Sequence, residues 1–132
     1  MFETTSGYMY SPTGHKMEPP GYSGHAEGVN NPAMESIHNV GPLPSGIYDL
    51  DAPLDHSQLG PFAIPLIPHA ENEMYGRNGF YIHGDEVAHA GEELASHGCI
   101  IQIRAIRQAM WLSLDHVLAV VANYSDFAQP NA

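Results

Sequence analysis

Proline and glycine constrain this chain more than any other feature of its sequence. The 132 residues include 11 prolines and 13 glycines, which are densest between residues 11 and 45. Proline fixes φ and lacks an N–H, so no long helix is expected in that segment. It should instead form turns and extended pieces, which either pack in place or cover a site as a lid.

Short runs of aromatic and β-branched residues predict strands. Such runs are found at residues 2–10, 46–50, 79–83, 100–103 and 116–122. Residues 62–68 are also apolar, but Pro65 favours an edge strand or an extended loop there. Residues 104–111 (RAIRQAMW) contain good helix formers and predict the best helix of the chain. The expected fold is therefore mainly β, with one or two short helices and long loops.

Length and composition fit one folded domain. Hydrophobic residues make up 43% of the chain, as in globular proteins, and 132 residues are enough for one modest core. We therefore expect a single domain over residues 1–132. No run of about 18 apolar residues is present, which predicts no membrane insertion. The polar start of the chain does not resemble a secretory signal, which predicts a protein made in the cytoplasm and carried elsewhere by another route.

The charge balance excludes some classes of partner. Four Lys and Arg residues face 15 Asp and Glu residues, for a formal net charge of −11. Nucleic acids and anionic membranes would repel such a chain, so neither is an expected partner. The charge is explained by solubility alone, or by a basic partner protein.

The chain has one cysteine, Cys99, so no disulfide can form within it. A lone cysteine is often a buried, inert side chain, and its surroundings decide whether it is reactive. His83 ends a predicted strand, and Cys99 follows 16 residues later, after a loop that can fold back. An imidazole beside a thiol can take its proton and activate it. The spacing therefore favours a nucleophile and base pair.

The residues just before Cys99 suggest how a reacting carbonyl would be held. Gly98 allows a tight turn and close approach of a substrate. Backbone N–H groups of Gly98 and Cys99 could then face the oxygen of a tetrahedral intermediate. Ser96 or His97 could orient the imidazole of His83 or the thiolate.

His83-Gly84 followed by Ser96-His97-Gly98-Cys99 resembles the signature of L,D-transpeptidases of the YkuD type. Further segments resemble the compact subfamily that includes type VI secretion L,D-transpeptidase effectors. These segments are residues 22–25 (YSGH), 30–32 (NNP), 39–48 (NVGPLPSGIY) and 76–85 (GRNGFYIHGD). The resemblance covers about residues 21–123.

The resemblance implies a YkuD-like β-sandwich or barrel that acts on the peptide stems of peptidoglycan without a cofactor. Cys99 would attack the carbonyl before a terminal D-residue, and His83 would be the base and later the acid. Water would resolve the acyl-enzyme in a carboxypeptidase reaction, and an amine would give exchange or cross-linking. Ser96, His97 and Gly98 would shape the turn and the oxyanion site.

Substrate contacts are expected around the same motifs. Ile101 stands where many larger transpeptidases carry a polar residue or arginine. The remaining cations therefore become candidates for a stem carboxylate, and structural pairing is expected for Arg107, on a helix face. The predicted substrate-binding residues are Arg77, Arg104, Tyr81, Gly84 and Asp85, of which Asp85 is expected mainly to hold its loop.

Other readings of the sequence remain open. His83, Asp85, His89 and His97 offer donors for a zinc hydrolase, although no metal site is expected. A wall-binding module without turnover and a phage or self wall-remodelling enzyme are further alternatives. The favoured one is an antibacterial effector that acts in the periplasm of a target bacterium, with a cognate immunity protein and secretion-apparatus components as partners.

Overall fold

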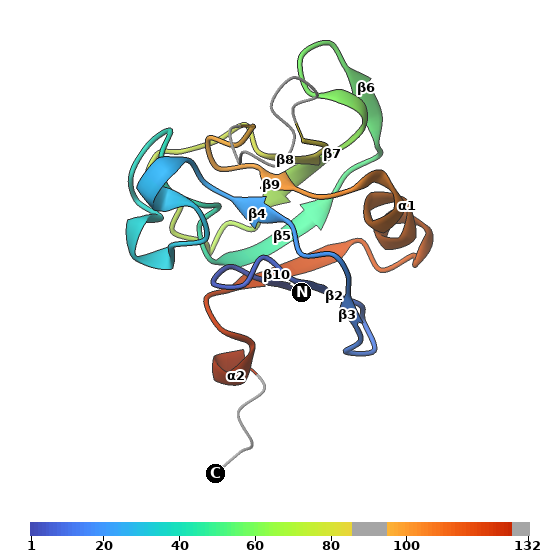
Figure 1. Ribbon diagram of the computed structural model, residues 1–132, viewed down its shortest axis with the longest axis horizontal. Helices are drawn as coiled ribbons and strands as arrows, with labels where there is room; N and C mark the ends of the chain where they lie inside the picture. Colours follow the sequence, from blue (N-terminus) through green and yellow to red (C-terminus); the bar gives the residue numbers. More distant parts are fainter. Residues whose placement is uncertain (86–94, 128–132) are drawn as a thin grey trace.

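The computed structural model describes residues 1–85 and 95–127, which form ten strands, two short 3-10 helices and two α-helices (Figure 1). The strands are β1 (Phe2–Glu3), β2 (Met9–Tyr10), β3 (Lys16–Met17), β4 (Tyr22–Ser23), β5 (Gly46–Leu50), β6 (Leu54–His56), β7 (Gly60–Pro68), β8 (Tyr81–His83), β9 (Ile100–Ile101) and β10 (Val117–Val121). The helices are η1 (Ala26–Gly28), η2 (Pro32–Met34), α1 (Arg104–Leu112) and α2 (Tyr124–Phe127). No helix in this described part is long and apolar enough to cross a membrane.

The strands form one mixed sheet that curls into a half-barrel. Nine of them follow the order β3-β2-β1-β10-β5-β7-β8-β9-β4, and β6 pairs with β7 outside this path. Most pairs are antiparallel, whereas β1 pairs with β10 and β8 pairs with β9 in parallel. In Figure 1, α1 lies at one side of the curled sheet, and the β6–β7 hairpin rises above β8. The expectation of a mainly β fold with short helices and long loops is confirmed.

The concave side of the sheet holds the core. Strand β5 shows the alternation that produces it, because Tyr48 and Leu50 are buried while Asp49 between them is exposed. Helix α1 adds Ile106 from its inner face. The largest side chains with almost no exposure are Phe2, Met9, Leu43, Tyr48, Ile64, Ile82, Ile100, Leu118 and Val120. They come from both ends of the chain, which ties the two termini of the described part into one core.

The prediction of an edge strand or loop around Pro65 is wrong. Strand β7 is nine residues long and lies between β5 and β8 inside the sheet. Successive parts of β7 pair with different strands, because residues 66–68 pair with β5 and residues 64–65 pair with β8. Pro65 stands where the pairing changes, and its carbonyl still accepts from the Asp51 N–H at 3.0 Å. An interior strand tolerates proline at this point, because neither neighbouring strand requires a backbone N–H donor from residue 65.

Residues 2–10 form a tight hairpin rather than one strand. β1 and β2 pair antiparallel, with Phe2 opposite Met9. Gly7 has φ of +79°, and a Cβ there would lie 2.0 Å from the carbonyl oxygen of Gly21. The turn therefore depends on glycine, and it leaves both apolar side chains directed into the core.

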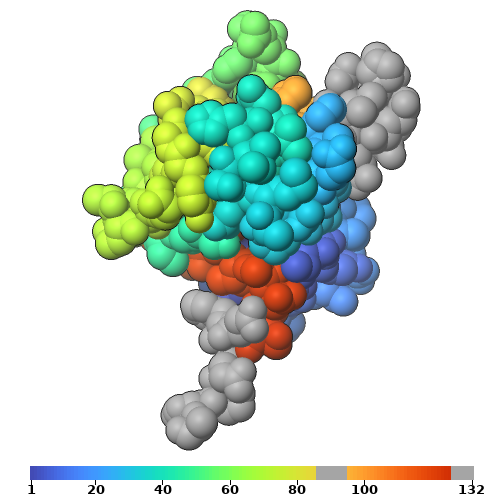
Figure 2. Space-filling view, turned by 90° about the vertical axis from the view of Figure 1, so that its left-hand side faces the viewer, coloured from blue at the N-terminus to red at the C-terminus, as the bar shows by residue number. Residues whose placement is uncertain are grey.

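The proline-rich segment 11–45 packs against the body of the protein. Figure 2 shows its second half, in cyan, lying against the yellow-green surface of residues 70–80. The Arg77 guanidinium joins the two through the carbonyls of Glu35, Gly41 and Pro42. The sequence left open whether this segment packs in place or covers a site as a lid. Its second half packs in place.

Candidate active site

The parallel pairing of β8 and β9 brings the ends of the two sequence motifs together. Ile82 pairs with Ile100, and His83 pairs with Ile101. Ile82 and Ile100 are both buried in the core, so the residues next to them project to the opposite face of this strand pair. His83 lies on that face, and Cys99 directly precedes β9. The thiol and the imidazole therefore come from adjacent chain segments. Cys99 lies two residues before Ile101, the residue that pairs with His83.

His83 is held in a defined tautomer by its own loop. Its side chain is buried, and Nδ1 lies 2.9 Å from the carbonyl oxygen of Gly84. A carbonyl can only accept, so Nδ1 carries the proton and Nε2 presents a lone pair. Burial lowers the pKa of His83 below its ordinary 6.5, against the opposing effect of the Gly84 bond. The neutral imidazole is the form that can accept a proton.

Cys99 rests as a neutral thiol. Its side chain is half-buried against the core, and Sγ accepts a hydrogen bond from the Tyr81 N–H at 3.3 Å. Burial raises the pKa of the Cys99 thiol, while the Tyr81 bond and the charge of Arg77 act in the opposite direction. The thiolate therefore has a donor ready for it, and the thiol needs a base to form it.

The pH dependence of turnover is expected to follow the lowered pKa of His83. The imidazole should stay neutral as pH falls through 6.5, so kcat/KM for a stem peptide should be maintained there and decline only at lower pH. Folding stability should also fall below pH 6.5, because the unfolded chain binds that proton first. A pH series of initial rates and urea midpoints checks both. A rate that already declines above pH 6.5 as the pH is lowered would contradict the lowered pKa of His83.

Ser96 organises the turn that carries Cys99. Its side chain is fully buried, and Oγ donates to the carbonyl of Cys99 at 2.6 Å. The same oxygen accepts from the N–H groups of Gly24 at 2.9 Å and Gly98 at 3.0 Å. All its bonding capacity is used within the turn, so Ser96 does not orient His83. Since the Gly98 N–H is taken, the Cys99 N–H is a donor of this turn that remains without an acceptor among the described residues.

Replacing Ser96 by alanine is expected to destabilise the fold. Two N–H groups and one carbonyl would lose their buried partner, which should lower the free energy of unfolding by about 2–4 kcal/mol. Urea unfolding measures this loss. Ser113→Ala is the matched control, because its exposed Oγ also bonds a backbone carbonyl, at 2.7 Å, and should cost below about 1 kcal/mol. Equal losses in the two variants would contradict the role given to Ser96.

His97 lies at the surface beside the turn. Its Nδ1 is 3.1 Å from the carbonyl oxygen of Asn39, and its ring stacks on His25 with centroids 5.0 Å apart. These contacts fix the position of the side chain, and its carbonyl accepts from Arg77 at 3.2 Å. The structure thus places His97 next to the site, with its ring turned toward the 25–39 segment.

The two arginines predicted to bind substrate have different surroundings. Arg77 is buried, and its guanidinium donates to four backbone carbonyls, those of Glu35, Gly41, Pro42 and His97. Through these bonds, the guanidinium of Arg77 links the loops that carry the four carbonyls. Arg104 is exposed at the start of α1, with its guanidinium 5.6 Å from the centroid of the Phe62 ring. Neither side chain adjoins His83 in this arrangement.

A cavity of about 580 Å³ opens beside His83. Its lining residues are Gln58, Leu59, Gly60, Pro61, His83, Gly84, Asp85, Ala95, His97 and Arg107. The lining includes three predicted site residues beside His83, namely Gly84, Asp85 and His97, and it does not include Cys99. The cavity therefore extends from the His83–Gly84 side of the pair. Its volume and its mixture of polar and apolar lining residues suit part of a peptide.

Some residues around this cavity were not predicted from the sequence. Tyr22 donates its O–H to the carboxylate of Asp85 at 3.0 Å, which ties β4 to the loop after β8. His56 contacts the ring of Tyr81 edge-on, with centroids 5.2 Å apart, and lowers the pKa of His83. Arg107 lines the cavity itself. These contacts join different strands and loops, so they become visible only in the folded chain.

The described residues contain no group of three His, Cys, Asp or Glu side chains that could hold a metal ion. His89, one of the four donors considered for a zinc site, lies outside the described residues. Of the others, Asp85 is bonded to Tyr22, and His97 contacts Asn39.

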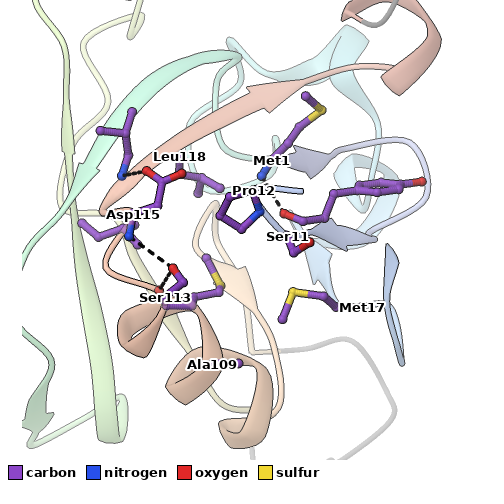
Figure 3. A pocket seen from close by; sticks show the side chains of 12 residues that line it. Met1, Ser11, Pro12, Met17, Ala109, Ser113, Asp115 and Leu118 are labelled. Carbon is purple, nitrogen blue, oxygen red and sulfur yellow. Dashed lines mark hydrogen bonds between the residues drawn. The ribbon is translucent and has the colours of Figure 1, made fainter. Parts of the chain in front are cut away.

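A second cavity, of about 180 Å³, lies at the other side of the sheet, between β10, α1 and the β2–β3 hairpin (Figure 3). Its wall is mainly apolar and includes Met1, Met17, Met110 and Leu118, with Ser113 and Asp115 hydrogen-bonded to each other at its edge. No histidine or cysteine lines it. The His83 cavity is therefore the candidate active site.

A comparison with known protein families identifies the family of this chain. The family model of the Tlde1 domain matches residues 17–123, which include both motifs and the strands β4 to β10. The chain belongs to the Tlde1 domain family. No curated protein and no solved structure matches the chain. As a Tlde1 domain, it is a type VI secretion effector domain, which confirms the effector part of the resemblance seen in the sequence.

Proposed function

We propose that this Tlde1 domain is a cysteine acyltransferase that acts on the peptide stems of peptidoglycan. The observation that carries the proposal is the register of β8 and β9, which places the His83 imidazole and the Cys99 thiol on neighbouring segments. The contact between His83 Nδ1 and the Gly84 carbonyl adds the tautomer that a general base requires. L,D-carboxypeptidase action and exchange of the terminal D-residue are the reactions proposed.

The proposed reaction uses the groups of the site in order. His83 Nε2 takes the thiol proton while Cys99 Sγ attacks the carbonyl carbon before the terminal D-residue. The Cys99 N–H stabilises the resulting oxyanion. The C–N bond then breaks, the imidazolium gives its proton to the leaving amine, and a thioester remains on Cys99. Water or a D-amino acid attacks the thioester, and the thiol is restored.

The effector family gives this chemistry a biological setting. We infer that the protein is carried from the producing cell and acts in the periplasm of a target bacterium, where trimmed or capped stems would prevent normal cross-linking. A producing cell would need a cognate immunity protein. The net charge of −11 favours a basic binding face on that partner.

Inhibitors of two kinds separate the proposal from its rivals. A thiol alkylator should abolish release of the terminal D-alanine from a purified tetrapeptide stem, and a metal chelator should leave the rate unchanged. The reverse pattern would support the zinc hydrolase. A domain that binds the stem but releases nothing, with or without the alkylator, would be a wall-binding module.

Growth of a test bacterium checks the effector setting. Directed to the periplasm by an added leader, the wild type should lyse or arrest the cells, whereas the same chain kept in the cytoplasm should not. The Cys99→Ala variant should be harmless in both places. Toxicity that is equal in both compartments, or that survives Cys99→Ala, would contradict the setting.

A further inference from the structure

Arg107 is a buried cation that backbone carbonyls hold in place. It is 5% exposed, and its Nε donates to the carbonyl of Gln102 at 3.0 Å. Its Nη1 donates to the carbonyls of Pro61 and Phe62 at 2.9 and 2.7 Å. Within residues 1–85 and 95–127, no carboxylate forms an ion pair with it. Arg107 was expected to have structural partners, and the partners found among the described residues are neutral backbone carbonyls. A buried, unpaired guanidinium attracts an anion strongly.

The second terminal nitrogen of Arg107 faces the candidate active site. Nη2 lies so close over Gly84 that a Cβ on this glycine would come to 3.0 Å from it. The described residues offer Nη2 no acceptor, so it retains donors for a ligand. Arg107, Gly84 and His83 line the same cavity of about 580 Å³. An anion bound there would sit next to the residue that follows the base.

The other charged group of this cavity is already engaged. The Asp85 carboxylate accepts the O–H of Tyr22 at 3.0 Å and forms no ion pair with Arg107. The two opposite charges therefore remain separate on the cavity wall.

We infer that Arg107 binds the free α-carboxylate of the terminal residue that leaves the stem, an inference that rests on the proposed function. His83 protonates the leaving amine, and the carboxylate of that residue is two bonds away from the amine nitrogen. Arg107 is beside Gly84, directly after His83, so it lies where that carboxylate must be. A free D-amino acid that enters for exchange presents the same amine and carboxylate. Arg107 therefore selects stems with a free carboxyl end, and acceptors of the same kind.

Two synthetic tetrapeptide stems test this assignment, one ending in D-alanine as the free acid and one as the carboxamide. For the wild type, kcat/KM should favour the acid by about 10–100-fold, as expected for a charge-assisted contact. Arg107→Gln should bring the acid-to-amide ratio close to one, and Arg107→Lys should restore part of it. Lys16→Gln is the control, since it removes one positive charge from the exposed strand β3, outside the cavity, and should keep the wild-type ratio.

The ratio distinguishes substrate binding from a structural role. If Arg107 only supported the fold, Arg107→Gln would slow both stems equally and leave the ratio unchanged, which would overturn the inference. An equal rate for acid and amide in the wild type would do the same, even if the glutamine variant failed to fold. Turnover of neither stem by a folded wild type would instead remove the proposed function, and the inference with it.

Discussion

Replacing His83 by alanine is expected to lower kcat for stem-peptide turnover by about 10²–10⁴-fold, the usual contribution of a general base. The protein should remain folded, because the other strand contacts of β8 involve its backbone and the Ile82 side chain. Added imidazole should recover part of the lost rate, since the vacated space adjoins the cavity beside Gly84. Initial rates with and without imidazole, together with urea unfolding, provide the measurement.

His15→Gln serves as the control for this variant. His15 is exposed and lies in the turn before β3, away from the cavity, so its replacement should leave kcat unchanged. A His83→Ala variant with near-normal kcat would contradict the assignment of the base. A structural role would be shown instead if imidazole failed to restore activity and the variant no longer unfolded cooperatively in urea.

Replacing Gly98 by alanine is expected to lower the stability of the fold substantially. Gly98 has φ of +134°, which side chains rarely adopt, and its added Cβ would lie 2.5 Å from Phe80 Cε1 and 2.6 Å from Arg77 Nη2. Neither neighbour is free to move, since Phe80 is buried and Arg77 is fixed by backbone carbonyls. Strain and overpacking together should lower the free energy of unfolding by about 2–6 kcal/mol.

Gly79→Ala separates the two causes. Gly79 also has positive φ, of +80°, but a Cβ there would meet nothing within 4 Å. It should therefore cost only the backbone strain, about 1–3 kcal/mol. The unfolding free energies of the two variants in urea give the difference. A Gly98→Ala variant that is no less stable than Gly79→Ala would contradict the packing described around the turn.

Much of the fold follows from local patterns in the sequence. The strand over residues 46–50 and the helix from Arg104 are where alternation and helix propensity place them. Pro65 shows where such patterns fail, because whether proline is tolerated depends on which neighbour strand pairs at that position. The hairpin of β1 and β2 likewise depends on Gly7 and its contact with Gly21, which no local pattern reveals.

The candidate site was predictable where the chemistry lies in a motif. His83 and Cys99 were proposed from their residue types, their spacing and the resemblance to a family motif, and the pairing of β8 with β9 brings their chain segments side by side. From the sequence, Arg77 was expected to contact substrate and Arg107 to pair structurally, although isolated cations in an acidic chain carry no local sign of their partners. The two arginines differ in their tertiary contacts. The guanidinium of Arg77 donates to four carbonyls, whereas Nη2 of Arg107 faces the cavity without an acceptor among the described residues. Burial and partners, which decide such roles, are properties of the folded chain.

Mass spectrometry of a purified tetrapeptide muropeptide tests the central claim most directly. The muropeptide is incubated with the wild type and with Cys99→Ala, each with and without an added D-amino acid. The wild type should remove the terminal D-alanine or replace it by the added residue, and Cys99→Ala should be slower by at least about 10³-fold. Unchanged muropeptide with the wild type, or equal turnover by Cys99→Ala, would contradict the cysteine mechanism.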